Sequence, residues 1–272
     1  MHTAPSETQP DIIDSPLGTA HQGTTLYIAR HGQSESNNQA LITGQLDVGL
    51  SPKGEQQAHA LAQCLRDLPL AAIYTSGLQR TLQTARPAAD EKALPITQLQ
   101  GLDEIHLGVL QGRHRDERDP EAMALWAQWQ ADVWNFCVPG GERFDLFTER
   151  VTQALQGVLA RHAGQPVLIV GHRATNRVLL GTLFGWPHER WAEIRLRNKF
   201  FYRLRLGAGE PEIATYTLSG SKTGRCQDGV TKRQRYNELA FTVRRDTTGV
   251  LRTGRWLGRS HIRQLSDISV SR

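Results

Sequence analysis

Residues 26–37 read Leu26-Tyr27-Ile28-Ala29-Arg30-His31-Gly32-Gln33-Ser34-Glu35-Ser36-Asn37, an apolar run that stops abruptly at an Arg, a His and a Gly. A short run rich in β-branched and aromatic residues predicts a buried strand. The polar residues behind it then lie at the carboxyl end of the strand, where open α/β sheets bind their ligands. We therefore expect the chemistry of the protein at this point of the chain.

The residues that follow this strand are suited to a phosphate group. Arg30 offers a planar, permanently charged fork for phosphate oxygens, and Gly32 lets the backbone approach a ligand without a Cβ in the way. A neighbouring cation disfavours imidazolium, so His31 should be neutral. A neutral imidazole in a cationic pocket is a nucleophile for phosphorus. For these three residues taken alone, an ordinary surface loop is the alternative.

A second apolar run ends in the same way. Pro166 to Val170 predicts a strand that stops at Gly171-His172, so two strands of the chain end in a histidine. Between them, Arg80 follows the short apolar run Leu70 to Tyr74 and begins a predicted helix, whose N-terminus favours an anion. The repeated arrangement favours one shared pocket. A solvent-exposed helix charge is the alternative for Arg80.

The rest of the chain alternates helical and strand patterns. Ser51-Pro52 marks a helix start, because Ser caps free N–H groups and Pro suits the first helical position. Apolar stripes predict this helix as far as Pro69 and further helices at 78–89, 147–164 and 173–184. Short apolar runs predict further strands at 95–99, 200–206 and 212–218. This alternation predicts an α/β fold, a three-layer α/β/α sandwich with a mostly parallel central sheet.

One segment carries an aromatic stripe at helical spacing. Within Asp116 to Phe136, the stripe consists of Met123, Trp126, Trp129 and Trp134. Such a stripe predicts core packing first, and a lid over a pocket as the alternative.

Length and composition suggest three parts. The chain has 272 residues and ordinary soluble composition, enough to bury a sizeable core. Residues 1–23 hold three prolines and little periodic hydrophobicity, which predicts a flexible leader. Residues 24–219 form the predicted globular domain, and residues 220–272 form a basic C-terminal extension of unknown role.

The net charge of +5 is concentrated in that extension. Residues 220–272 hold 12 Lys and Arg against four Asp and Glu, so the rest of the chain is mildly acidic. Phe241 to Arg245 and Val250 to Trp256 read as two strands of a hairpin. Its aromatic residues could stack on bases, but a basic run is more often a solvated surface, so we do not expect a nucleic-acid partner.

Cysteine usage and the lack of apolar blocks bear on the compartment. Cys64, Cys137 and Cys226 are odd in number and scattered, which argues against a disulfide framework or a zinc site and for a reducing compartment. No run approaches the length of a membrane span, and the first residues lack the blocks of a signal peptide. We expect a cytoplasmic protein without a membrane partner.

The spacing R-H-G-x-S-x-x-N, formed by Arg30-His31-Gly32, Ser34 and Asn37, resembles the signature of the histidine phosphatase (phosphoglycerate mutase-like) superfamily, branch 1. Residues 76–85 resemble its S-x-L-x-R-x-x-x-T-A pattern. Residues 102–112 resemble its L-x-E-x-x-x-G-x-x-x-G stretch. Pro139 to Glu142 matches a further block, and the resemblance spans roughly residues 24–218. The one minor departure in the first block is Gln33, where the family usually has an acidic residue.

The resemblance implies a role for each matched residue. Arg30, His31, Arg80 and His172 would form the phosphate pocket, with His31 as the nucleophile that becomes phosphorylated. Glu104 would be the proton donor, with Asp103 and His106 as local competitors. Further contacts to the phosphoryl group would come from Asn37, Thr43, Gln45 and Glu142. No cofactor and no metal is implied.

These expectations point to a metal-independent phosphatase acting on a small phosphorylated metabolite through a phosphohistidine. A phosphoglycerate mutase-type enzyme is the alternative within the fold, although mutases resemble E-R-H-Y-G around the acid, where this chain has Glu104-Ile105-His106-Leu107-Gly108. A non-catalytic phosphate-binding module is the alternative from another class. Such a module is expected to lack at least one of the four pocket residues or the proton donor, and this chain has all five: Arg30, His31, Arg80, Glu104 and His172. The sequence leaves the substrate and the oligomeric state open.

Overall fold

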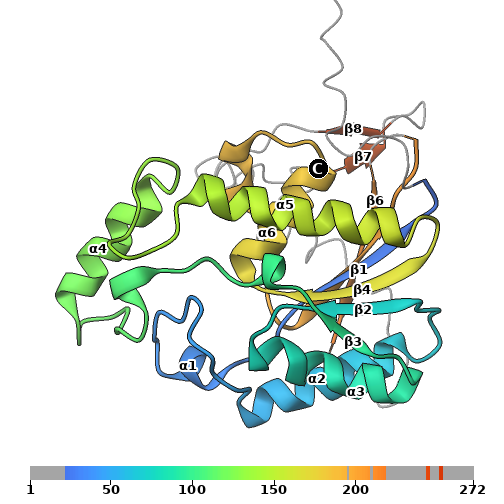
Figure 1. Ribbon diagram of the computed structural model, residues 1–272, viewed down its shortest axis with the longest axis horizontal. Helices are drawn as coiled ribbons and strands as arrows, with labels where there is room; N and C mark the ends of the chain where they lie inside the picture. Colours follow the sequence, from blue (N-terminus) through green and yellow to red (C-terminus); the bar gives the residue numbers. More distant parts are fainter. Residues whose placement is uncertain (1–21, 195, 209–210, 219–242, 246–250, 254–272) are drawn as a thin grey trace, which may run out of the picture.

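The computed structural model describes residues 22–194, 196–208, 211–218, 243–245 and 251–253, and a six-stranded sheet lies at its centre (Figure 1). The strands are arranged in the order β3-β2-β4-β1-β5-β6. Their bounds are β1 Thr25–Arg30, β2 Ala72–Thr75, β3 Ile96–Gln98, β4 Pro166–Gly171, β5 Phe200–Arg205 and β6 Glu212–Thr217. All six strands confirm expected ones, with ends that differ by at most two residues.

The sheet is mostly parallel, as expected. β1, β2, β3 and β4 run parallel to one another, and β5 and β6 continue the sheet antiparallel beyond β1. β1 and β4 lie at the centre, and every residue inside them is buried. Both faces of these strands are therefore covered, which explains their continuous apolar sequences.

Helices form a layer on each face (Figure 1). On one face, α2 (Pro52–Leu65) and α3 (Gln79–Lys92) pack with Tyr27, Ile73 and Phe201 into one hydrophobic cluster. On the other face, α5 (Phe144–Arg161) and α6 (Arg173–Leu183) pack with Leu26, Ile28 and Ile169 into a larger cluster. This arrangement is the predicted three-layer sandwich.

The start of α2 follows the sequence prediction. Ser51 caps the helix by accepting a hydrogen bond from the Gly54 N–H at 3.2 Å, and Pro52 occupies the first turn. Ser51 also holds Gln33, which follows Gly32 in the loop after β1, since the Ser51 N–H donates to the Gln33 carbonyl at 2.8 Å. The helix start is thereby tied to the end of the segment 30–33.

Some elements differ from the prediction in extent. α4 runs from Pro120 to Ala131, so the expected helix over 116–136 is shorter at both ends. Short elements that the periodicity did not indicate are α1 (Glu35–Asn38) and the 3₁₀ turns η1 (Gln100–Leu102), η2 (Gly108–Leu110) and η3 (His188–Glu193). Each spans six residues or fewer, too few to show a helical apolar period.

The extension contributes a small paired element. β7 (Val243–Arg245) and β8 (Leu251–Thr253) are antiparallel, which confirms the strands of the expected hairpin. The turn between them, most of the extension and nearly all of the predicted leader lie outside the described residues.

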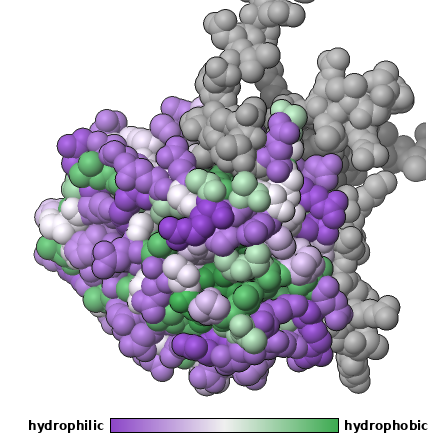
Figure 2. Space-filling model, turned by 45° about the vertical axis from the view of Figure 1, so that its right-hand side comes forward, coloured by the Kyte–Doolittle hydropathy of each residue, from purple (hydrophilic) through white to green (hydrophobic). Residues whose placement is uncertain are grey.

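The surface is mainly hydrophilic on the side shown in Figure 2, with one hydrophobic area low on that face. Within the described part of the chain, no helix combines the length and the apolar character needed to span a bilayer.

Candidate active site

Strand register brings the two predicted histidines together. Arg30 at the end of β1 pairs with Gly171 at the end of β4, and Thr75 at the end of β2 pairs with Val170. The residues that follow these strands therefore emerge at one edge of the sheet. His31 donates its backbone N–H to the Gly171 carbonyl at 3.0 Å, and its ring centroid lies 5.2 Å from that of His172.

The hydrogen bonds of His31 define its reactive nitrogen. Nδ1 lies 2.7 Å from the carbonyl oxygen of Gly32 and must therefore carry the proton that it donates. Burial holds the pKa of His31 well below 6.5, and the charges of Arg30 and Arg80 lower it further. The ring is thus neutral, and Nε2 keeps its lone pair. This is the nucleophilic form that the sequence predicted.

His172 is locked by two hydrogen bonds. Nδ1 accepts from Arg80 Nε at 3.3 Å, and Nε2 lies 2.7 Å from the Ser76 hydroxyl. Because the guanidinium can only donate, Nδ1 is unprotonated and Nε2–H donates to Ser76. Burial, followed by the charge of Arg80, holds the pKa of His172 well below 6.5. His172 is fully buried beside His31 and does not line the pocket.

The backbone of segment 30–33 lies very close to the start of α2. A Cβ at Gly32 would lie 2.6 Å from the Gly54 carbonyl oxygen, and a Cβ at Gly54 would lie 2.1 Å from the Gln33 carbonyl oxygen. The Gly32 N–H also donates to the Thr84 hydroxyl of α3 at 2.9 Å. Gly32 was predicted to permit a close approach to a ligand; its nearest neighbour is the start of α2.

Arg80 is the most enclosed cation of the site, with 1% of its surface exposed. Its Nη1 and Nη2 donate to the carbonyls of Leu46 and Gly44, both at 2.7 Å, in addition to the bond to His172. Arg80 therefore organises the loop 43–46 as well as lining the pocket. Burial lowers its pKa, while the nearby Glu104 carboxylate opposes that shift.

Arg30 also lines the pocket and has a donor to spare. Its Nη1 donates to the Leu196 carbonyl at 3.2 Å, whereas its buried Nε has no hydrogen-bond partner. Burial lowers the pKa of Arg30 to about 10, with a further contribution from Arg173. The side chain thus stays charged at neutral pH. A phosphate oxygen is a fitting acceptor for the spare donor.

Glu104 is held at the N-terminus of α6. Its Oε2 accepts from the Ala174 N–H at 3.1 Å, and its Oε1 accepts from the Thr175 N–H at 3.3 Å. These backbone donors fix the carboxyl group at the pocket wall, and a helix N-terminus is a favourable place for it. Since His172 is the residue before α6, the start of one helix positions both groups.

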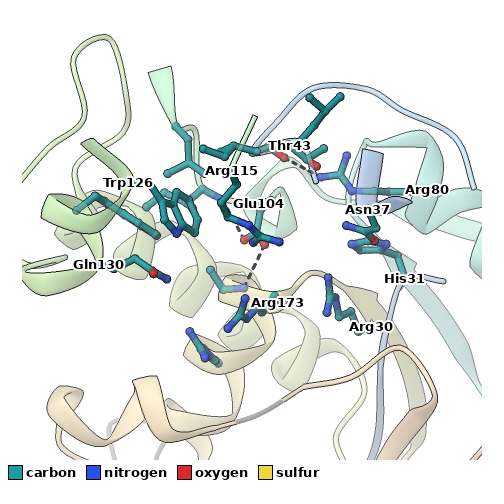
Figure 3. A pocket seen from close by; sticks show the side chains of 18 residues that line it. Arg30, His31, Asn37, Thr43, Arg80, Glu104, Arg115, Trp126, Gln130 and Arg173 are labelled. Carbon is teal, nitrogen blue, oxygen red and sulfur yellow. Dashed lines mark hydrogen bonds between the residues drawn. The ribbon is translucent and has the colours of Figure 1, made fainter. Parts of the chain in front are cut away.

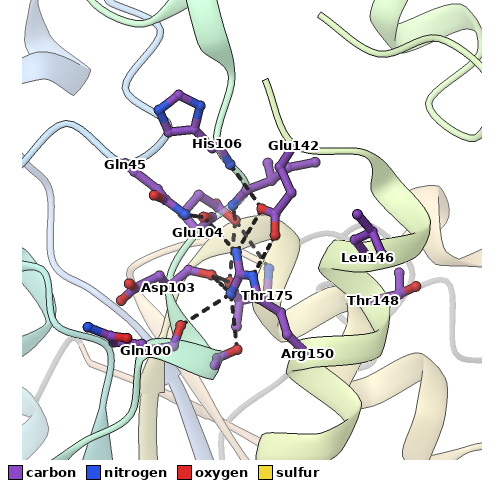
Figure 4. Close-up of polar contacts among 12 residues, drawn as sticks. Gln45, Gln100, Asp103, Glu104, His106, Glu142, Leu146, Thr148, Arg150 and Thr175 are labelled. Carbon is purple, nitrogen blue, oxygen red and sulfur yellow. Dashed lines mark hydrogen bonds and ion pairs between the residues drawn. The ribbon is translucent and has the colours of Figure 1, made fainter. Parts of the chain in front are cut away.

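Arg150 of α5 supports the loop that carries Glu104, and nothing in the sequence patterns pointed to it (Figure 4). Its guanidinium donates to the carbonyls of Asp103 at 2.9 Å and Glu104 at 3.1 Å, and to both carboxyl oxygens of Glu142 at 2.6 and 2.9 Å. Gln45 donates to the same Glu104 carbonyl at 2.8 Å. These contacts fix the backbone on which the acid sits.

Two predicted phosphate contacts are thus placed elsewhere. The side chains of Gln45 and Glu142 are outside the pocket lining and hold the Glu104 loop instead. A carboxylate such as Glu142 would repel phosphate, and Arg150 is its partner here. Asn37 and Thr43 do line the pocket, and Asn37 Oδ1 accepts from the Ser34 N–H at 3.2 Å. The amide nitrogen of Asn37 remains to donate.

The pocket is strongly cationic (Figure 3). His31, Asn37 and Arg80 lie at one end, and Trp126 and Gln130 of α4 lie at the other, with Glu104 and Arg115 between them. Glu104 is the one carboxylate among the described lining residues. The arginines that line the pocket are Arg30, Arg80, Arg115, Arg173 and Arg177.

Several lining residues were missed by sequence reasoning. Arg115, Gln130, Arg173 and Arg177 carried no predicted role, although Arg173 directly follows His172 in the chain and Arg177 lies one helical turn further on. Trp126 and Trp129 of the aromatic stripe form one wall of the pocket, as the lid alternative anticipated. Trp129 also belongs to the larger core cluster, against which Trp126 and Trp134 pack, as the core prediction anticipated, whereas Met123 is 41% exposed. Within the described ranges, no three His, Cys, Asp or Glu side chains are grouped to hold a metal ion.

The two buried histidines predict a dependence of stability on pH. In the unfolded chain each takes up a proton near pH 6.5, whereas the folded protein keeps both neutral to a lower pH. The unfolded state then binds more protons, so the free energy of unfolding should fall as pH drops below about 6.5, by up to about 1.4 kcal/mol per pH unit for each histidine. The loss ends once pH reaches the folded pKa values.

Urea denaturation at pH 7.5, 6.5 and 5.5 measures this slope. The control is His172→Gln, which removes one of the two groups and should give a shallower slope whatever its own stability. Equal slopes for the two proteins would contradict the prediction.

The fold thus places a strongly cationic pocket, lined by His31 and five arginines, at the carboxyl ends of the parallel strands. Residues 26–219 match the model of the histidine phosphatase superfamily (branch 1), and the chain belongs to this superfamily. A probable phosphoglycerate mutase GpmB of Erwinia tasmaniensis is 34% identical over 174 residues, which cover 64% of this chain and 80% of that protein.

Two solved structures show the same fold. Bacillus stearothermophilus YhfR has 29% identity and a TM-score of 0.63, with 75% of this chain and 98% of that chain covered. A mycobacterial glucosyl-3-phosphoglycerate phosphatase has 25% identity and a TM-score of 0.61, with 72% of this chain and 99% of that chain covered. Relatives named as mutases and as phosphatases therefore both resemble this chain.

Proposed function

We propose that the protein is a metal-independent phosphatase that hydrolyses a small phosphomonoester through a phosphohistidine on His31. One observation carries the proposal. His31 is held neutral with Nδ1–H bonded to the Gly32 carbonyl, and it lines a pocket where Glu104 is the one carboxylate among the described lining residues and five are arginines.

In the first step, the lone pair on His31 Nε2 attacks phosphorus in line with the leaving oxygen. The bond between phosphorus and that oxygen breaks, and Glu104 in its carboxylic acid form donates a proton to the departing alkoxide. Arg30 and Arg80 stabilise the negative charge on the phosphoryl oxygens. His172 does not line the pocket; it accepts a hydrogen bond from Arg80 and so keeps that side chain in position.

In the second step, Glu104 is a carboxylate and takes a proton from a water molecule. The oxygen of that water attacks phosphorus, the bond between phosphorus and Nε2 breaks, and His31 regains its lone pair. The products are the alcohol and inorganic phosphate. Apart from the substrate and this water molecule, the proposal assigns every role in the two steps to side chains of this chain.

A mutase is the alternative, because the Erwinia relative is named as a probable phosphoglycerate mutase. The phosphatase name of the mycobacterial structure supports hydrolysis. The short stretch from Glu104 to α4 favours hydrolysis too, because a mutase has to shield its phosphohistidine from water.

The expected partner is a small phosphorylated metabolite. The small number and scattered positions of the cysteines support the cytoplasm as the compartment.

Phosphate release and trapping of the intermediate test the proposal together. With EDTA present, the protein should release phosphate from p-nitrophenyl phosphate and from alkyl phosphates. Rapid mixing into alkali should trap one acid-labile phosphoryl group per chain, and peptide mapping should place it on His31. Phosphorylation of His31 by 2,3-bisphosphoglycerate followed by return of the phosphate to phosphoglycerate, without release, would identify a mutase instead. A folded protein that shows neither reaction would point to a binding module.

A further inference from the structure

A second cavity adjoins the catalytic pocket. It has a volume of about 380 Å³, against about 120 Å³ for the catalytic pocket. The two are lined by a common set of residues: Trp129, Gln130, Arg173, Ala174 and Arg177. A ligand held at His31 can therefore continue past the start of α6 into the larger space.

The walls of the second cavity are aromatic. Trp134 stacks on His188 with ring centroids 4.2 Å apart and meets Phe144 edge-on at 4.7 Å. Trp191 of η3 meets His188 edge-on at 4.5 Å, and Trp129 completes the wall next to the catalytic pocket. These rings support one another, so the cavity does not depend on a single side chain for its shape.

The two cavities differ in net charge: the catalytic pocket is strongly positive, whereas the charges that line the second cavity balance. The catalytic pocket has five arginines and a single carboxylate among its described lining residues. The second cavity keeps Arg173 and Arg177 on the shared wall but adds two acidic side chains, Asp132 and Glu189. Both acidic oxygens of Asp132 accept hydrogen bonds from the Asn135 amide, as a carboxylate does. A second phosphate beyond the shared wall would meet these negative charges.

An uncharged flat ring fits such a space. Aromatic side chains bind flat rings through offset-stacked and edge-to-face contacts, and burial of the ring adds apolar stabilisation. A small sugar phosphate or phosphoglycerate would leave the aromatic cavity filled with water.

We propose that the physiological substrate is a phosphomonoester whose leaving group carries an aromatic or heteroaromatic ring without further negative charge, and that this ring lies in the second cavity. This inference rests on the phosphatase proposed above. The phosphoryl group lies at His31, the ester oxygen lies near Glu104, and the ring lies beyond Arg173 and Arg177, between α4 and η3.

The test compares esters that share the same kind of leaving oxygen, because phenols leave more easily than alkyl alcohols. The pairs are 3-phenylpropyl phosphate with propyl phosphate, and a nucleoside 5′-monophosphate with ribose 5-phosphate. We expect kcat/KM to be about tenfold or more higher for at least one ring-bearing ester than for its ring-free partner, as is typical of stacking on aromatic side chains.

Two variants of α4 localise the effect. Ala131 lines the second cavity and is exposed, so Ala131→Trp should fill the space, lower kcat/KM for the ring-bearing ester and reduce that ratio to about one. Ala127 is also exposed on α4 but lines neither cavity, so Ala127→Trp should keep the preference.

Three results would overturn the inference. Equal kcat/KM for both members of each pair would show that the ring is not bound, with the phosphatase function intact. A preference that persists in Ala131→Trp would place the ring elsewhere. If neither these esters nor p-nitrophenyl phosphate is hydrolysed and His31 is not phosphorylated, the proposed function fails, and this inference fails with it.

Discussion

His31→Ala should abolish turnover, lowering kcat by about 10⁴-fold or more, because loss of a covalent nucleophile removes the reaction path itself. The arginines that bind phosphate remain in this variant, so substrate binding should survive. Fluorescence titration with a phosphomonoester should give a dissociation constant within about tenfold of that of the wild type, since the charged contacts are retained.

Stability has to be measured beside activity, because His31 is only 5% exposed and its removal leaves a space. Thermal unfolding of His31→Ala therefore accompanies the rate measurement. His59→Ala is the matched control, since His59 is an exposed histidine of α2 that lines neither cavity, and it should retain p-nitrophenyl phosphate hydrolysis. A folded His31→Ala protein with a rate within tenfold of the wild type would show that His31 is not the nucleophile.

Glu104→Gln should separate the two chemical steps. An amide cannot protonate an alkoxide, so hydrolysis of an alkyl phosphate should fall by about 10²- to 10⁴-fold, the usual contribution of a general acid or base. p-Nitrophenolate leaves without a proton, so its first step should be nearly unchanged. The second step still needs a base for water and should be slow, and the phosphohistidine should accumulate.

Stopped-flow measurement with p-nitrophenyl phosphate should therefore show a burst of about one nitrophenolate per chain and then slow turnover. Asp103→Asn is the control, because Asp103 was the competing acid; its Oδ1 accepts from the Gly77 N–H at 2.8 Å and it does not line the pocket. If Glu104→Gln slows alkyl and aryl esters equally without a burst, another group donates the proton.

The central part of the site could be predicted from sequence because its residues sit at strand ends. His31 and His172 each follow an apolar strand, and parallel strands place their carboxyl ends at one edge, so the two rings had to lie close together. Arg80 follows β2 and reaches the same edge through the helix that it begins. These positions depend on backbone topology, which hydrophobic periodicity reveals.

The supporting residues depend on side-chain pairing across distant loops, which periodicity does not reveal. Arg150 lies 46 residues from Glu104, and its five carbonyl and carboxylate partners come from two distant places in the chain, residues 100–104 and Glu142. Gln45 and Glu142 were assigned to phosphate by motif, whereas the structure turns both toward the Glu104 loop. The aromatic stripe was predicted as core first, because the spacing of tryptophans is the same whether they face a core or a cavity.

The close contact between Gly32 and Gly54 limits which amino-acid substitutions the site can accept, and it does so on one side of the pocket only. Any side chain at either position would push segment 30–33 away from α2. The half of the site built on β1, α2 and α3 therefore tolerates little variation in sequence. α4 and η3 lie on the other side of the pocket, where they line the second cavity and pack into the larger hydrophobic cluster. Descendants of this chain could exchange one substrate for another by altering α4 and η3, while the phosphoryl chemistry is inherited unchanged.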